Sequence, residues 1–323
     1  MAIWGNANDL AQAIVNINKE TQFAPHQSEM MMWLLDTLDS IDIFPPKRFE
    51  IYLKGGTCVQ HYLPSESQRF SMDLDFSVCF QENVDIPQKA TIVKEYLREL
   101  NGELLKSGWR ADHGTMKIPE TPLGFTSICF CGRIFQPTKC RKTVSKILGV
   151  EDAAFVKTEF FLHGHDPEYS RQKLLLVSAN YAVRDVFFNL ASKTRLLADK
   201  IVALSGEGYG ARDENKDIID LKALSELNGI DLTLASNMIT GWAQSHLDQE
   251  GNLNPIDPPA RIIHAARQTV TARSEITDEA LAQMTGLLYA RGRPGFNLSR
   301  NDWRSMCLQV VAFLDKRVLP LFD

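Results

Sequence analysis

The sequence lacks the segments that would place a chain of 323 residues outside the ordinary globular class. No uncharged apolar stretch approaches the ~18 residues that a membrane-spanning helix requires. The first residues show no basic region followed by an apolar run, and neither internal repeats nor low-complexity segments occur. Apolar residues make up 44% of the chain, which suffices for a hydrophobic core. We therefore expect a folded, cytoplasmic protein without a membrane segment.

Excess positive charge is also missing. The formal net charge is −5 and the isoelectric point is near 5.9. Domains that hold nucleic acid by their overall charge are usually basic, so any contact with nucleic acid must be local. Residues 133–146 are the exception, because they hold five basic residues and no acid: Arg133, Lys139, Arg141, Lys142 and Lys146. This run is either a solvated loop or a patch for a polyanion.

Paired cysteine motifs are absent as well. The six cysteines include no Cys-x-x-Cys spacing, and several lie within apolar strand patterns. Cys129 and Cys131 share one face of an expected strand, but core packing is the simpler reading for them than metal binding. The cysteines thus indicate free thiols in a reducing compartment.

Hydrophobic periodicity predicts an α/β (α+β) protein, in which a mixed central sheet flanked by helices is followed by an all-helical C-terminal domain. The expected boundary lies near residue 180, where the period changes to 3.6, giving domains 1–180 and 181–323. Helices are expected at 7–20, 26–40, 57–62, 87–107, 181–204 and 231–247. Strands are expected at 49–53, 72–79, 109–118, 125–134, 154–163 and 174–178.

The most informative stretch begins where the first expected strand ends. Lys54 is followed by Gly55, Gly56 and Thr57, at the start of a short helix. Glycine lets the backbone approach a ligand closely and adopt positive φ, and amide groups at the start of a helix can face an anion. The pattern indicates a seat for phosphate groups.

Carboxylates follow on the next expected strand. Asp73 and Asp75 are two residues apart, so a strand places them on one face. Two neighbouring carboxylates repel each other, and a divalent cation commonly relieves that repulsion. Together with the glycines, the pair predicts a nucleoside triphosphate bound with Mg²⁺. Glu159, on a later strand, is a candidate third carboxylate.

The order of these residues resembles a known active site. Gly-Gly-Thr followed by Arg69-x-Ser71-x-Asp73-x-Asp75 is similar to the opening of nucleotidyltransferases of the DNA polymerase beta type. More narrowly, the chain resembles the AbiEii/AbiGii toxin family, the toxin half of type IV toxin–antitoxin and abortive-infection systems, which includes the MenT toxins. Two further family motifs match residues 200–204 (Lys-Ile-Val-Ala-Leu) and 216–221 (Lys-Asp-Ile-Ile-Asp-Leu).

The resemblance implies roles for the matched residues. Asp73 and Asp75 would bind Mg²⁺, with Glu159 as the third ligand on a neighbouring strand. Lys200 would balance charge on the phosphates or on the leaving pyrophosphate. Asp217 would be essential, as a base, as a group that orients Lys200 or as a nucleotide contact. A purely structural salt bridge between Asp217 and Lys200 is the alternative.

The remaining matched positions would bind the nucleotide, in a cleft to which the helical domain contributes. These positions are Lys54, Gly55, Gly56, Thr57, Arg69, Ser71 and Lys200.

The acceptor of the nucleotide is less defined than the chemistry. The resemblance implies a cognate antitoxin and favours an RNA acceptor, the 3′ end of tRNA first, with residues 133–146 and the C-terminal helices as its contact surface. A protein hydroxyl or a small molecule such as an aminoglycoside is the alternative acceptor. A protein that binds a nucleotide or partner without catalysis is a third hypothesis, which the intact Asp73, Asp75 and Lys200 disfavour.

Overall fold

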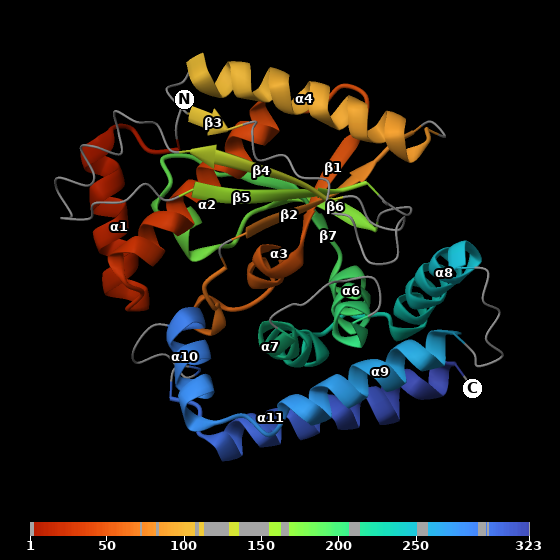
Figure 1. The fold of residues 1–323 in the computed structure, drawn as a ribbon. Helices are drawn as coiled ribbons and strands as arrows, with labels where there is room; N and C mark the ends of the chain where they lie inside the picture. The colour runs from red at the N-terminus through yellow and green to blue at the C-terminus, as the bar shows by residue number, and fades with distance from the viewer. Residues whose placement is uncertain are drawn as a thin grey trace. The chain divides into compact units, whose positions relative to one another are not determined.

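The computed structural model describes residues 3–71, 73–81, 84–106, 110–112, 129–135, 155–162, 168–206, 214–250, 258–289, 295 and 297–322 (Figure 1). The chain divides into two compact units. The first holds most of the chain up to Ala191, and the second holds most of the chain from Ser192. Each unit is described by itself below.

A mixed sheet forms the centre of the first unit. Its strands in the described residues are β1 (Glu50–Lys54), β2 (Asp73–Cys79), β3 (Arg110–Asp112), β4 (Cys129–Phe135), β5 (Phe155–Phe161), β6 (Tyr169–Lys173) and β7 (Phe187–Ala191). Their order across the sheet is β3-β4-β5-β2-β1-β7-β6. β1 pairs antiparallel with β2 and parallel with β7, and β2 pairs parallel with β5. The expected mixed central sheet is therefore confirmed.

Helices cover this sheet. They are α1 (Ala7–Thr21), α2 (Pro25–Ile43), α3 (Gly55–His61) and α4 (Ile86–Lys106), with a short turn of helix at Ser65–Ser67. α2 is buried along most of its length, because it packs on β5 and β7 and also against α1. Its Trp33 is fully buried and meets the ring of Trp4 edge to face. The buried Glu29 and Thr37 hydrogen-bond to Trp33, so α2 carries polar groups into the core with their partners.

Two expectations for the chain after residue 168 are wrong. The continuous helix expected over 181–204 is replaced by a short helical turn at Val177–Tyr181, by β7 and by α6, which begins at Lys193. Burial along β7 alternates, with Phe188 buried and Phe187 exposed, as a strand requires. The strand expected at 174–178 lies earlier, as β6, whose polar sequence fits an edge strand without an apolar face.

The described part of the second unit is helical. It contains α6 (Lys193–Ser205), α7 (Glu214–Ser225), α8 (Leu232–Glu250), α9 (Pro258–Arg273), α10 (Asp278–Leu288) and α11 (Arg300–Phe313), with further helical turns at Leu314–Val318 and Leu319–Leu321. α6 packs against α7, α8 and α9 and is accordingly buried on most sides. The helical C-terminal region expected from the sequence is confirmed. Among the helices described, none has the length and apolar character needed to cross a bilayer.

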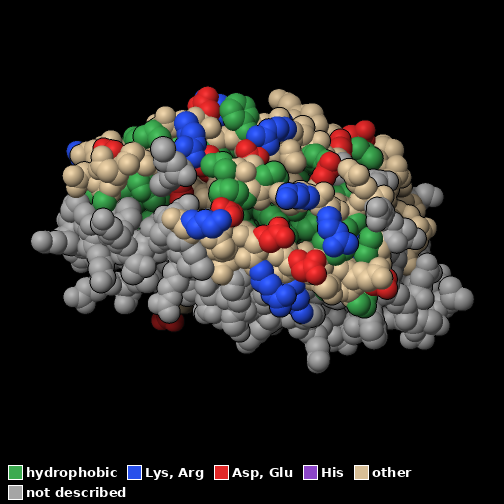
Figure 2. Space-filling view, turned by 90° about the horizontal axis from the view of Figure 1, so that it is seen from above, with side chains coloured by type: hydrophobic (Ala, Val, Ile, Leu, Met, Phe, Trp, Pro, Cys, Tyr) green, Lys and Arg blue, Asp and Glu red, His purple; other side chains and the backbone are tan. Residues whose placement is uncertain are grey.

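Surface charge is mixed in the parts that the structure describes. On the face shown in Figure 2, basic and acidic side chains are interspersed. Four arginines of the C-terminal helices each face an acid, in the pairs Arg267–Asp315, Arg273–Glu214, Arg300–Asp278 and Arg304–Glu275. In each pair the acid offsets the positive charge of its arginine on that surface. Of the basic run 133–146, residues 136–146 lie outside the described residues.

Candidate active site

The turn between β1 and α3 leaves little room for a side chain, least of all at Gly55. Gly55 has φ +68°, and a Cβ atom there would lie 1.9 Å from Oδ2 of Asp75. A Cβ atom on Gly56 would lie 2.8 Å from Nη2 of Arg69 and 3.1 Å from Oγ of Ser71. The two glycines therefore let the backbone pass close to an acid, a guanidinium and a hydroxyl.

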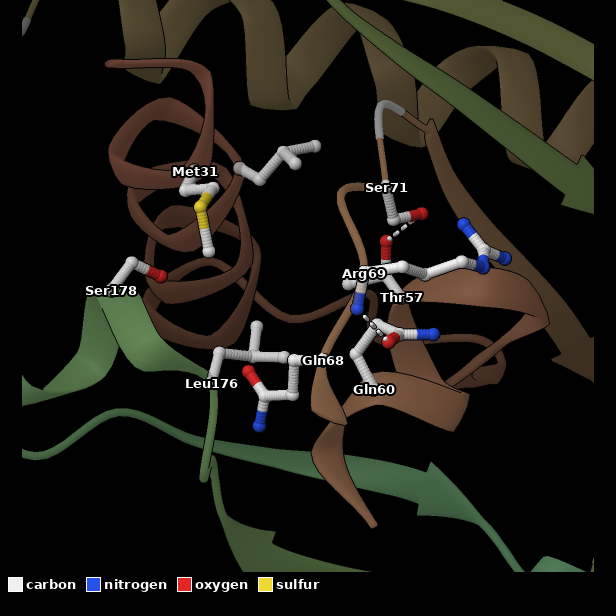
Figure 3. A pocket seen from close by; sticks show the side chains of 9 residues that line it. Met31, Thr57, Gln60, Gln68, Arg69, Ser71, Leu176 and Ser178 are labelled. Carbon is white, nitrogen blue, oxygen red and sulfur yellow. Dashed lines mark hydrogen bonds between the residues drawn. The ribbon is translucent and has the colours of Figure 1, made fainter. Parts of the chain in front are cut away.

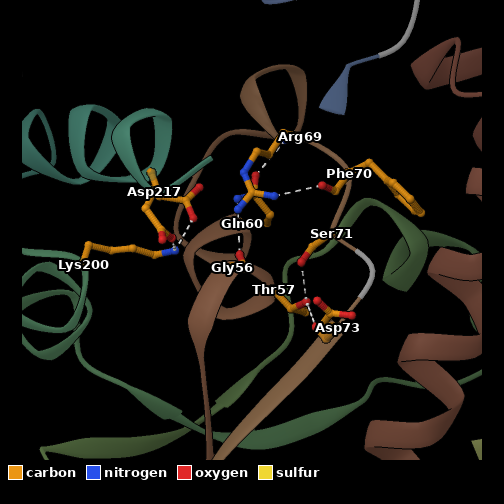
Figure 4. A network of polar contacts seen from close by, with 10 residues as sticks. Gly56, Thr57, Gln60, Arg69, Phe70, Ser71, Asp73, Lys200 and Asp217 are labelled. Carbon is orange, nitrogen blue, oxygen red and sulfur yellow. Dashed lines mark hydrogen bonds and ion pairs between the residues drawn. The ribbon is translucent and has the colours of Figure 1, made fainter. Parts of the chain in front are cut away.

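Thr57 connects this turn to β2. Its hydroxyl donates a hydrogen bond to the carbonyl of Asp73 at 2.7 Å and lies 3.0 Å from Oγ of Ser71 (Figure 4). Because the single Thr57 proton goes to the carbonyl, Ser71 is the donor in the second bond. Thr57, Ser71 and Asp73 thus form one hydrogen-bonded group.

Arg69 lies under the turn, with 4% of its surface exposed. Its Nη1 donates to the carbonyl of Phe70 at 2.9 Å, and its backbone N–H donates to Oε1 of Gln60 at 2.7 Å. Nε2 of the same Gln60 side chain donates to the carbonyl of Gly56 at 3.3 Å. Gln60 belongs to none of the motifs in the sequence. Its only sequence signal is its position one helical turn after Gly56.

The expected carboxylates lie on neighbouring central strands. Asp75 is in register with Lys54 of β1 on one side and with Glu159 of β5 on the other. Asp73 is in register with Lys157. We call these three acids and the two lysines in register with them the carboxylate row: Lys54, Asp73, Asp75, Lys157 and Glu159. Its acids are half-buried, so they are neither sealed in the core nor fully solvated.

Two lysines accompany these acids. Lys157 forms an ion pair with Glu159. The Nζ atom of Lys54 lies 3.8 Å from the ring centroid of Phe161, a cation–π contact. Among the described residues, no three His, Cys, Asp or Glu side chains are arranged as a ready metal centre. The donor set nevertheless fits a hard divalent cation in its chemistry, since Asp73 and Asp75 share a face and Glu159 is directly beside Asp75.

A small pocket lies beside these residues in the first unit (Figure 3). It is lined by Met31, Leu34, Thr57, Gln60, Gln68, Arg69, Ser71, Leu176 and Ser178. The cavity volume is about 20 Å³, which is close to the space that one water molecule needs. In this state the pocket therefore has no room for a nucleobase.

The second unit contains a separate group of charges. Nζ of Lys200 on α6 lies 2.5 Å from Oδ1 of Asp217 and 2.7 Å from Oδ2 of Asp220, both on α7 (Figure 4 shows the first pair). The exposed fraction of the side chain is 8% for Lys200 and 1% for each acid. We call these three residues the lysine cluster. Asp217 and Asp220 are three residues apart on α7, so they share one face of that helix.

The mixed sheet, the glycine turn and the paired aspartates define the nucleotidyltransferase class of fold. The sequence profile of the family described as "Nucleotidyl transferase AbiEii toxin, Type IV TA system" matches residues 38–316. The chain belongs to this family. It is therefore a nucleotidyltransferase toxin of a type IV toxin–antitoxin system, and the family implies a nucleoside triphosphate substrate and a cognate antitoxin.

One solved structure agrees in fold. The chain is similar to MenT4, a nucleotidyltransferase toxin from Mycobacterium tuberculosis, with 14% identity and a TM-score of 0.58 over 96% of this chain and 91% of that chain. A nucleotidyltransferase-like protein from Paracoccidioides brasiliensis shares 16% identity over 69% of this chain and 90% of that one, with a TM-score of only 0.35. No curated protein matches the chain.

Proposed function

We propose that the protein transfers a nucleoside monophosphate from a nucleoside triphosphate to an RNA acceptor, with the 3′ end of tRNA as the first candidate, in a Mg²⁺-dependent reaction. The observation that carries this proposal is the position of the carboxylate row. Asp75 fills the space beside Gly55, so an acid on the central strand directly adjoins the glycine turn.

The residues of the first unit divide into two groups by role. One group binds the phosphate oxygens, and we call it the seat: Gly55, Gly56, Thr57, Arg69 and Ser71. Lys54 lies beside the seat, in the carboxylate row. Asp73, Asp75 and Glu159 would hold Mg²⁺, whose charge offsets that of the triphosphate. Glu159 also forms an ion pair with Lys157, and a carboxylate has enough lone pairs to keep that pair while it binds a cation.

The transfer itself is a displacement at phosphorus. An acceptor hydroxyl oxygen forms a bond to the α-phosphorus, the bond to the bridging oxygen of the β-phosphate breaks, and pyrophosphate leaves. The hydroxyl proton passes to a base or to water. Lys200 and Asp217 are the proposed catalytic residues of the second unit, because they match the family's later motifs. Lys200 is suited to balancing phosphate charge, and Asp217 either accepts the proton, contacts the nucleotide or orients Lys200.

The experiment is a labelling assay. The purified protein is incubated with Mg²⁺, each α-labelled nucleoside triphosphate in turn, and total bacterial RNA and protein. The test variant is Asp73→Asn/Asp75→Asn. The control is Asp185→Asn, which removes an exposed carboxylate that pairs with Lys173. A parallel reaction contains a chelator.

We expect label in RNA of tRNA size with the wild type and with Asp185→Asn, and none with the double variant or the chelator. Label in protein would instead favour the alternative acceptor. Label in neither fraction, with tight nucleotide binding, would contradict the proposed RNA and protein acceptors and leave a small molecule or a binding role.

A further inference from the structure

Gln60 is a buried side chain whose two polar atoms bind two different segments of the seat. Its surface is 3% exposed. Oε1 accepts the backbone N–H of Arg69 at 2.7 Å, and Nε2 donates to the carbonyl of Gly56 at 3.3 Å. One amide therefore joins the glycine turn to the segment that precedes β2 (Figure 4).

The Arg69 guanidinium also lies close to the glycine turn. A Cβ atom placed on Gly56 would lie 2.8 Å from Nη2 of Arg69, so the turn passes next to the Arg69 side chain. On the far side, Thr57 makes a second connection through Ser71 and the carbonyl of Asp73. The seat is thus held at two points, by Gln60 below Arg69 and by Thr57 next to β2.

The two connections differ in whether their polar groups can also bind a ligand. The hydroxyls of Thr57 and Ser71 can exchange partners when a phosphate oxygen arrives, because a hydroxyl both donates and accepts. The Gln60 amide contacts backbone groups that have no such freedom and is itself buried. Its bonds should persist when the seat is filled.

We infer that Gln60 is a positioning residue of the seat: it fixes the distance between the glycine turn and Arg69, so that both face the same triphosphate. The inference rests on the proposed binding of the triphosphate at the seat. Preorganisation of this kind lowers the ordering cost of binding. Gln60 itself does not touch the nucleotide.

The test compares two buried glutamines of the same unit. Gln60→Met keeps the length of the side chain and removes both hydrogen bonds. Gln27→Met is the matched control, because Gln27 is buried and accepts the backbone N–H of Ala24 at the start of α2, a helix that contains no residue of the seat. Inorganic tripolyphosphate with Mg²⁺ serves as the probe, since it needs no knowledge of the preferred base. Calorimetry gives its Kd, and thermal unfolding reports stability.

We expect Gln60→Met to raise the Kd for tripolyphosphate about tenfold, and the KM for the nucleoside triphosphate by a similar factor, with kcat changed less. Gln27→Met should lower the Tm comparably and leave both constants unchanged. If Gln60→Met does not fold, Gln60→Asn replaces it, because the shorter amide cannot reach both segments.

Two results would overturn the inference while leaving the proposed function intact. One is an unchanged Kd in a folded Gln60 variant. The other is an equal loss of affinity in Gln27→Met, which would trace the effect to general destabilisation. A wild type that binds neither tripolyphosphate nor any nucleoside triphosphate would contradict the seat itself, and the inference with it.

Discussion

The carboxylate row and the lysine cluster hold their charges in opposite ways. In the row, acids on β2 and β5 are half-buried and adjacent, and the lysines beside them lie on the same strands or on a neighbouring one. In the cluster, one lysine is enclosed between two acids that are 1% exposed. The acids of the cluster are enclosed with their lysine, whereas the acids of the row, although Lys157 pairs with Glu159, keep partly accessible oxygen ligands for an external cation.

This difference distinguishes acids that are part of the folded core from acids that are available to a ligand. A buried carboxylate is tolerated only when a cation or several donors face it, and Lys200 supplies that charge to Asp217 and Asp220. The acids of the row avoid this cost by remaining partly solvated. We therefore expect the cluster to contribute to stability in addition to its proposed part in catalysis, and the row to contribute mainly to ligand binding.

The largest effect should come from removing the cation of the cluster. Lys200→Met leaves two buried acids without their lysine, and breaking a buried ion pair in this way costs about 3–5 kcal/mol. The free energy of unfolding, measured with urea, checks this value. The control is Lys193→Met on the same helix, where the lysine donates to the carbonyl of Asn228 at a partly exposed position. Equal losses in the two variants would show that enclosure by Asp217 and Asp220 is not the cause.

A second prediction concerns a buried acid that has no lysine. Asp36 on α2 accepts the N–H of Ile3 at 2.9 Å, near Asp39, which pairs with Arg184. Burial, with a smaller contribution from Asp39, raises the pKa of Asp36 from 3.8 to about 7, although the Ile3 N–H and Arg184 oppose the shift. Between pH 4 and 7 the folded protein therefore holds a proton that the unfolded chain has released, so stability falls as pH rises.

Asp36→Asn removes this titration. The stability of the wild type relative to the variant should fall by about 3 kcal/mol between pH 5 and pH 8, since one pH unit corresponds to roughly 1.4 kcal/mol per proton. Urea unfolding at the two pH values measures the difference. Asp42→Asn, on the same helix but paired with Arg171 at the surface, is the control for removing a carboxylate from α2. A difference that does not vary with pH would contradict the raised pKa of Asp36.

A third prediction tests the glycine beside the row. Gly55→Ala adds both the strain of positive φ and an overlap with the Asp75 carboxylate. Gly206, which ends α6 at φ +73°, has open space around its Cβ position and serves as the control. We expect Gly206→Ala to cost about 1 kcal/mol and Gly55→Ala about 2 kcal/mol, with loss of nucleotide transfer only in the latter. Retained transfer in Gly55→Ala would show that Asp75 can move without consequence.

The sequence predicted those helices and strands whose pattern of apolar and polar residues matches their buried and exposed sides. β1 and β2 are apolar strands at the centre of the sheet, and the helical spacing of α2 and α4 is regular, so these elements were found close to their observed bounds. β6 was missed because an edge strand needs no apolar face, and β7 because its short alternation adjoins the helical pattern of α6.

For the candidate site too, local sequence patterns predicted some features and not others. The spacing of Asp73 and Asp75 sufficed to place them on one strand face, and the strand of Glu159 was correctly expected. Which acid lies opposite which depends on strand register, which no local pattern encodes. The role of Gln60 could not be predicted for a related reason. Its two partners are backbone groups, which every residue has, so the amino-acid sequence does not indicate them.

The smallest effect should come from a charge pair at the surface, which is the opposite extreme from the lysine cluster. Arg304 on α11 lies 3.4 Å from Glu275, and both side chains are more than half exposed, at 61% and 62%. Water already solvates both charges, so Arg304→Ala should change the free energy of unfolding by less than about 0.5 kcal/mol, and 1 M salt should remove even that. Urea unfolding at low and high salt measures it, with Glu275→Ala as the partner variant. A loss above 1 kcal/mol that persists in salt would mean that exposure does not separate the two kinds of ion pair in this protein.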